Sequence, residues 1–270
     1  MSSPQPIGVF DSGIGGLTVA SAIRKVLPNE KIIYFGDTAH MPYGDKSPEA
    51  IKYYSLKIGK FLQEKGCKVI VIACNTASSL GYDDLKQFLG DSVPVFNVID
   101  PVVKSVAESS GYEKVGVIGT KATIGSGVYA RKINELNPEL KVRSLATPLL
   151  APMIEEGFFE NNISQAVINS YLSAPKLKNI NALILACTHY PLIKKEIESF
   201  YGNQVDILNT ASIVADDVKM RLEQLQLTNK ETVPYKDEFY VSDLTPSFEL
   251  STKLFFGDKI DLIQKNIWDK

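Results

Sequence analysis

Two short segments place a cysteine beside polar residues, directly after a run of apolar residues. Cys74 opens Cys-Asn-Thr-Ala, and Cys187 opens Cys-Thr-His-Tyr. A thiol at a helix N-terminus can have its pKa lowered from about 8.5 into the range of roughly 3.5–7.5, so that it acts as a base when ionised and as an acid when protonated. A single such cysteine is more often a buried packing residue. Because two cysteines share matching surroundings, we expect a pair of acid–base thiols.

Other residues near these motifs could handle protons with the thiols. His189 lies two residues after Cys187, and Asp11 ends an earlier apolar run; each could accept or direct the proton of a neighbouring thiol. The third cysteine, Cys67, has no comparable companions and is expected to be structural. A metal site built from Cys74, Cys187 and His189 is not favoured, because no CxxC or HxxxH spacing supports it.

The segment DSGIGG (11–16) is expected to contribute hydrogen-bond donors. It lacks the GxGxxG spacing and the GK[ST] ending of nucleotide loops, so we interpret it as a tight turn whose backbone N–H groups can meet a carboxylate. All four arginines lie outside the motifs, and an anionic substrate would therefore be held by neutral donors and helix ends. For Tyr43, in PYG (42–44), core packing is an equal alternative. Further side-chain donors are expected from Ser12, Asn75, Thr76 and Thr188.

Apolar runs rich in Val and Ile alternate with stretches of helical period, for example 48–65. Continuous apolar strands between helices predict an α/β fold whose parallel sheets are covered on both faces. Ligands bind such sheets beyond the carboxyl ends of the strands, where the polar residues named above fall. The predicted strands are 7–10, 31–37, 68–74, 93–100, 114–120, 141–147, 181–187 and 205–210.

The two halves of the chain form an approximate repeat. VIVIACNTA corresponds to ALILACTHY, GVFDSGIGG to GVIGTKATIG, and NVID to ILNT. Two matched halves would supply two cysteines that can face each other. The repeat predicts a boundary near 97–114. A final strand (239–243) and a helix ending near Gly257 are too short for a third domain and are expected to pack onto an existing one.

Composition excludes several classes of protein. The 270 residues suffice for one large domain or for two of about 100–150 residues each. A net charge of −2 provides no basic footprint for nucleic acid. No signal peptide and no apolar run of roughly 20 residues is present, so a soluble cytoplasmic protein without a membrane partner is expected. Three scattered cysteines do not make a disulfide framework.

Four motifs taken together, CNTAS, CTHYPL, FDSGIGGLT and DTAHMPYG, closely resemble those of bacterial glutamate racemases, in the cofactor-independent aspartate/glutamate racemase superfamily. The resemblance runs from Ile7 to about Gly257. It implies two similar α/β domains, 1–97 with 209–270 and 98–208, with glutamate bound in the cleft between them. It further implies a homodimer, no cofactor, and a supply of D-glutamate for peptidoglycan synthesis.

The resemblance also implies roles for particular residues. Cys74 would act as the base towards D-glutamate with help from Asp11, and Cys187 towards L-glutamate with help from His189. Asp37 and Glu155 match acidic positions with supporting roles, although Glu156 adjoins the latter. The implied substrate contacts are Asp11, Ser12, Tyr43, Gly44, Asn75, Thr76, Thr188 and His189.

Three other functions remain open from the sequence. The first is racemisation of aspartate or a related isomerisation, which a substrate panel would separate. A hydrolase using one thiol would leave the other cysteine dispensable and would introduce no solvent deuterium at the α-position. A non-catalytic two-domain binding protein would bind glutamate unchanged, and it would have no need of matched thiols at the cleft.

Overall fold

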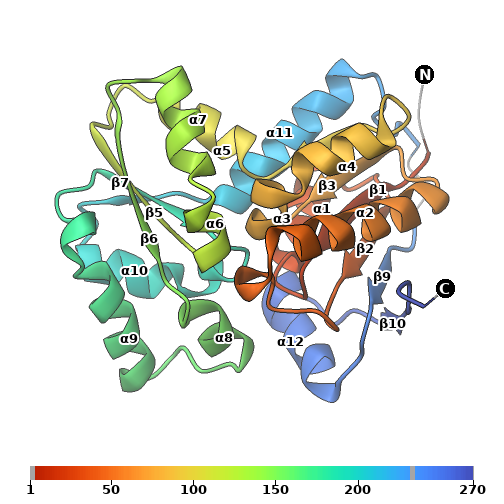
Figure 1. Ribbon diagram of the computed structural model, residues 1–270. Helices are drawn as coiled ribbons and strands as arrows, with labels where there is room; N and C mark the ends of the chain where they lie inside the picture. Colours follow the sequence, from red (N-terminus) through yellow and green to blue (C-terminus); the bar gives the residue numbers. More distant parts are fainter. Residues whose placement is uncertain (1–3, 232–234, 270) are drawn as a thin grey trace.

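The chain folds into two parallel β-sheets, each flanked by helices (Figure 1). The computed structural model describes residues 4–231 and 235–269. In the first sheet the strand order is β10-β9-β2-β1-β3-β4, in the second β6-β5-β7-β8, and the pairings are parallel. The predicted α/β class is confirmed. The strands are β1 (Ile7–Asp11), β2 (Ile32–Gly36), β3 (Val69–Ile72), β4 (Val95–Asn97), β5 (Lys114–Gly119), β6 (Lys141–Ala146), β7 (Ala182–Ala186), β8 (Asp206–Ile207), β9 (Glu238–Val241) and β10 (Leu262–Gln264).

The two sheets repeat one strand order. The run β2-β1-β3-β4 in the first sheet corresponds to β6-β5-β7-β8 in the second. The strands that lead to the two cysteines, β3 and β7, therefore occupy equivalent places beside β1 and β5. This equivalence agrees with the repeat expected from the cysteine motifs.

The first sheet is covered on both faces, as its continuous apolar strands require. Alternate side chains point to opposite faces: Val9 and Tyr34 belong to one buried cluster, while Phe10 and Phe35 belong to another. Helix α2 begins after Ser47, whose side chain accepts the N–H of Ala50 and caps the helix. One face carries α1 (Leu17–Val26), α11 (Thr210–Gln224) and α12 (Pro246–Phe256), the other α2 (Pro48–Glu64), α3 (Asn75–Leu80) and α4 (Tyr82–Leu89).

The second sheet carries the remaining helices. On one side α5 packs against α7, and elsewhere α9 packs against α10. None of the helices in the described ranges is both long and apolar enough to span a lipid bilayer. The helices are α5 (Asp100–Ala107), α6 (Lys121–Gly125), α7 (Val128–Leu136), α8 (Leu150–Glu155), α9 (Asn162–Leu172) and α10 (Lys194–Tyr201), with 3₁₀ turns η1 (Tyr43–Asp45), η2 (Pro175–Leu177) and η3 (Tyr190–Ile193).

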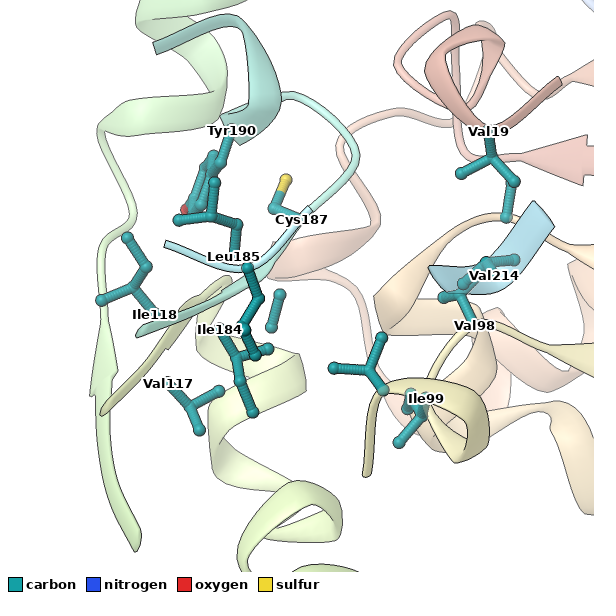
Figure 2. Packing of buried hydrophobic residues seen from close by; sticks show 14 of the residues in the cluster. Val19, Val98, Ile99, Val117, Ile118, Ile184, Leu185, Cys187, Tyr190 and Val214 are labelled. Carbon is teal, nitrogen blue, oxygen red and sulfur yellow. The ribbon is translucent and has the colours of Figure 1, made fainter. Parts of the chain in front are cut away.

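One hydrophobic cluster is continuous across the two halves. Figure 2 shows Val98 and Ile99, which follow β4, and Val214 of α11 within the same buried cluster as Ile184 of β7. The chain passes to the second sheet after β4 and returns through α11 to β9 and β10 (Figure 1). The predicted strand 239–243 corresponds to β9, which pairs with β2, whereas β10 was not predicted. The domain boundaries at 97/98 and 208/209 stay a prediction.

Candidate active site

A small cavity of about 30 Å³ lies where the two halves meet. Cys74 approaches it from the segment after β3 and Cys187 from the segment after β7, so each half contributes one thiol. The lining residues are Ser12, Pro42, Tyr43, Gly44, Cys74, Asn75, Thr76, Thr120, Ala151, Glu155, Ala186, Cys187, Thr188 and His189.

Cys74 is the N-cap of α3 and is almost fully buried. Its Sγ accepts the backbone N–H of Ala77 at 3.4 Å. Burial, and to a lesser extent the Asp11 carboxylate, raise the pKa of this thiol to about 12, although the Ala77 N–H and the Ser12 hydroxyl oppose the rise. The sequence-based expectation of a lowered pKa is therefore wrong for Cys74, because desolvation outweighs the N–H groups at the start of a helix only six residues long.

Asp11 lies behind the cavity wall and is completely buried. Its Oδ2 accepts the N–H groups of Gly13 and Gly16 at 3.1 and 3.0 Å, which fixes the glycine turn around it. Its Oδ1 accepts no hydrogen bond from any residue of the described chain. Burial raises the pKa of Asp11, while His189 pulls it down. The charge of Asp11 raises the pKa of the Cys74 thiol, but Asp11 does not line the cavity, and its expected contact with substrate stays a prediction.

Cys187, His189 and Glu155 form a line of contacts. The Nδ1 of His189 lies 3.6 Å from the Sγ of Cys187, and its Nε2 lies 2.8 Å from Oε1 of Glu155. Burial lowers the pKa of His189, but the neighbouring thiol and carboxylate outweigh burial and raise the pKa well above its usual value. Glu156 is exposed, so Glu155 is the one of the two adjacent glutamates that reaches the site.

The glycine turn of the first half packs directly on the second cysteine motif. A Cβ atom added to Gly15 would lie 2.5 Å from Cε1 of His189 and 2.6 Å from Oγ1 of Thr188. The Thr18 hydroxyl donates to the carbonyl oxygen of Thr188 at 3.1 Å. The predicted tight turn at 11–16 therefore also acts as a contact between the halves.

Asp37 organises the loop that carries the predicted PYG segment. Its buried carboxylate accepts hydrogen bonds from the Tyr43 hydroxyl at 2.6 Å and the Ser242 hydroxyl at 2.8 Å, and it lies 2.9 Å from Nδ1 of His40. Burial, with Asp37 beside it, raises the pKa of Tyr43 well above its usual value, so the hydroxyl stays protonated. Because the Tyr43 hydroxyl already donates its hydrogen bond to Asp37, it is not available as a donor to a ligand in the cavity.

The remaining predicted contacts converge on the cavity. Ser12, Asn75, Thr76 and Thr188 all line it. Among the described residues no arginine or lysine does so, in line with the expectation of neutral donors. Thr120 also lines the cavity, and its Oγ1 lies 2.9 Å from Oγ1 of Thr76 across the two halves. The sequence places Thr120 at the end of the predicted strand 114–120, equivalent to Ser12 after β1, but Thr120 was not among the expected substrate contacts.

The cavity is narrow. Its volume of about 30 Å³ is far below the roughly 300–1,000 Å³ of typical ligand pockets. Hydroxyl contacts across the halves, and the packing of Gly44 against Thr120, hold the walls together. The chain crosses between the two halves twice, after β4 and after β8.

Known proteins resemble this chain over nearly its whole length. The profile of the family described as Asp/Glu/Hydantoin racemase matches residues 17–218. A glutamate racemase of Chlorobaculum parvum is 42% identical over 260 residues, which cover 96% of this chain and 95% of that protein. The crystal structure of glutamate racemase from Francisella tularensis in complex with D-glutamate has a TM-score of 0.92, with 38% identity and 98% of each chain covered. The glutamate racemase of Thermus thermophilus in complex with β-chloro-D-alanine has a TM-score of 0.87 at 38% identity, again with 98% of each chain covered.

Proposed function

The chain belongs to the Asp/Glu/Hydantoin racemase family, and from this premise we propose that it interconverts L-glutamate and D-glutamate by proton transfer between the α-carbon and two thiols. The observation that carries the proposal is the placement of Cys74 and Cys187 on one cavity, each supplied by a different half of the molecule. The relatives named above supply the choice of substrate.

In the proposed reaction one proton leaves the α-carbon on one face and a different proton is added on the opposite face, while the other substituents stay bound. The Cys187 thiolate takes the α-proton of L-glutamate and becomes a thiol, and the electron pair passes into the α-carboxylate. The Cys74 thiol then gives its own proton to the opposite face of the α-carbon and becomes a thiolate. The reverse sequence converts D-glutamate, so each turnover leaves the two sulfurs with exchanged protonation states.

The neighbours of the thiols supply the rest of the chemistry. General acid–base catalysis contributes about 10²–10⁴-fold, so charge on the α-carboxylate must also be stabilised by fixed donors away from water. We assign this role to the side chains of Asn75, Thr76 and Thr188, which line the cavity. His189 stabilises negative charge on Cys187, and Asp11 accepts or returns the proton of Cys74.

The wider role follows from the same premise. We propose that the D-glutamate supplies cytoplasmic peptidoglycan synthesis and that the protein works as a homodimer. No cofactor is needed, because both protons are handled by side chains of this chain. The domains 1–97 with 209–270 and 98–208 are proposed to open and close around glutamate.

Incubation of each glutamate enantiomer in D₂O tests the reaction. Circular dichroism should decay to zero with the wild-type protein, and deuterium should appear at the α-carbon. Cys74→Ser and Cys187→Ser should each lose racemisation, whereas Cys67→Ser serves as the matched control and should keep it. Full racemisation by either of the first two variants would exclude the two-thiol scheme.

The same assay separates the alternatives. An aspartate racemase would act on aspartate in preference to glutamate. A hydrolase using one thiol would tolerate loss of the other and would incorporate no α-deuterium, and a binding protein would leave both enantiomers unchanged.

A further inference from the structure

A tyrosine outside the cavity holds one end of a cavity side chain. The Tyr129 hydroxyl donates to Oδ1 of Asn75 at 2.6 Å. Tyr129 is 3% exposed, lies on α7 of the second half and does not line the cavity, whereas Asn75 begins α3 of the first half and does. The hydrogen bond therefore joins the two halves directly beside the site.

The hydroxyl determines which way the amide of Asn75 is turned. A buried O–H group requires an acceptor, and Oδ1 of Asn75 is the one that Tyr129 has among the residues described. Burial raises the pKa of Tyr129 far above its usual value, so the hydroxyl remains a donor at any working pH. With Oδ1 engaged, the NH₂ end of the amide is left free; it makes no hydrogen bond within 4–231 or 235–269.

We propose that Tyr129 is a positioning residue that turns the NH₂ group of Asn75 towards a carboxylate of the substrate. The reversed amide would aim a carbonyl oxygen at an anion and would leave the tyrosine proton buried without an acceptor. This inference rests on the proposed function, because it takes glutamate to be the ligand. According to this inference, Tyr129 in the second half determines how the amide donor of Asn75 in the first half is oriented.

The contact also links donor orientation to closure of the cleft. Tyr129 and Asn75 stand on opposite halves, so their hydrogen bond forms only when the halves meet. In the open form water can satisfy the amide in either orientation. Closure then selects the orientation in which the NH₂ group faces the substrate.

Tyr129→Phe tests the inference, because it removes the hydroxyl and keeps the ring. In the variant, closure leaves Oδ1 of Asn75 buried and unpaired, and we expect KM for both enantiomers to rise about tenfold while kcat stays within about threefold. Tyr112→Phe is the matched control: it also deletes a tyrosine hydroxyl bonded to a side chain, Asp206, but far from the cavity, and KM should not change.

A double-mutant cycle separates positioning from general support of the fold. Adding Tyr129→Phe to Asn75→Ala should change KM by less than about twofold, because the amide that Tyr129 acts on is gone. A full tenfold rise in both backgrounds, or an unchanged KM in Tyr129→Phe alone, would overturn the inference. Failure of the wild-type protein to racemise glutamate would instead contradict the proposed function.

Discussion

The Nδ1 atom of His189 lies 3.6 Å from the sulfur of Cys187. On its far side the same ring meets Glu155, so a protonated imidazole can sit between two groups that carry or acquire negative charge. Among the described residues, the largest charge effect on Cys74 comes from the carboxylate of Asp11, an anion and not a cation. The two thiols therefore work in different electrostatic surroundings, and each can be impaired separately.

His189→Asn should slow the proposed step at Cys187 and leave the step at Cys74 intact. Because enantiomers have equal free energies, kcat/KM must fall by the same factor in both directions, about 10²-fold for a lost acid–base partner. The primary deuterium isotope effects for the two enantiomers should become unequal. The effect should increase with 2-deuterated L-glutamate, whose deuterium is transferred to Cys187, and decrease towards unity with 2-deuterated D-glutamate.

Asp11→Asn is the matched control for this measurement. This substitution impairs the step at Cys74. The isotope effect should therefore increase with 2-deuterated D-glutamate and decrease with 2-deuterated L-glutamate. Isotope effects that stay alike for the two enantiomers in both variants would contradict the pairing of His189 with Cys187 and of Asp11 with Cys74.

The raised pKa of Cys74 should govern its rate of alkylation when no substrate is added. In a Cys67→Ala/Cys187→Ser background, the rate of alkylation of Cys74 by iodoacetamide should rise about tenfold per pH unit between pH 7 and 9, because the thiolate fraction grows in that proportion below the pKa. Mass spectrometry of quenched samples measures this rate. When the same variant is unfolded in urea, its alkylation rate should level off near pH 9. An alkylation rate that already levels off at pH 8 in the folded protein would rule out the raised pKa.

Gly15→Ala should prevent the glycine turn from seating against the second half. The added methyl group would lie 2.5 Å from the His189 ring, so the ring or the whole half must move. A displacement of about 1 Å at a reacting group costs on the order of 10²-fold in rate, and we expect kcat/KM to fall accordingly. Gly111→Ala, where no atom lies within 4 Å of the new methyl group, should retain activity. Wild-type activity in Gly15→Ala would show that this contact is unimportant.

Much of this arrangement follows from local sequence pattern. Apolar runs such as 68–74 and 181–187 predict buried parallel strands, and a polar residue directly after such a run must lie at the carboxyl edge of the sheet. For that reason the sequence pattern alone predicts that Cys74 and Cys187 lie at the site. The short strand β10 escaped prediction because its three residues are partly exposed at a sheet edge and show no clear periodicity.

Features that depend on how the halves meet could not be predicted. Thr120 and Tyr129 come next to Thr76 and Asn75 only through packing across the interface, which local sequence does not encode. The hydrogen bond from the Tyr43 hydroxyl to Asp37 and the raised pKa of Cys74 likewise depend on burial. Sequence patterns predict the position of a side chain along a strand or helix, but not the solvent that surrounds it.

Lys68→Met should reveal the cost of leaving a buried charge unpaired. Lys68 Nζ lies 2.6 Å from Oε2 of Glu30, and both side chains are 1% exposed. Removal of the cation should lower the free energy of unfolding by about 3–5 kcal/mol, measured by urea denaturation. Lys104→Met, which removes an exposed partner of Glu108, should change it by less than about 1 kcal/mol. If Lys68→Met lowers the free energy of unfolding no more than the control does, the Glu30 carboxylate does not need Lys68 to remain buried.

The shared strand order of the two sheets has a consequence for chirality. Two similar folds of L-amino acids can be superposed by rotation, but enantiomers are related by reflection, which no rotation reproduces. A duplicated architecture can therefore present a sulfur to each side of one carbon, yet it cannot offer mirror-image pockets to the two substrates. In the proposed reaction the same pocket binds both enantiomers by their three other substituents. A proton leaves one face of the α-carbon and a different proton is added to the other, so the two thiols can have unlike neighbours, Asp11 and His189.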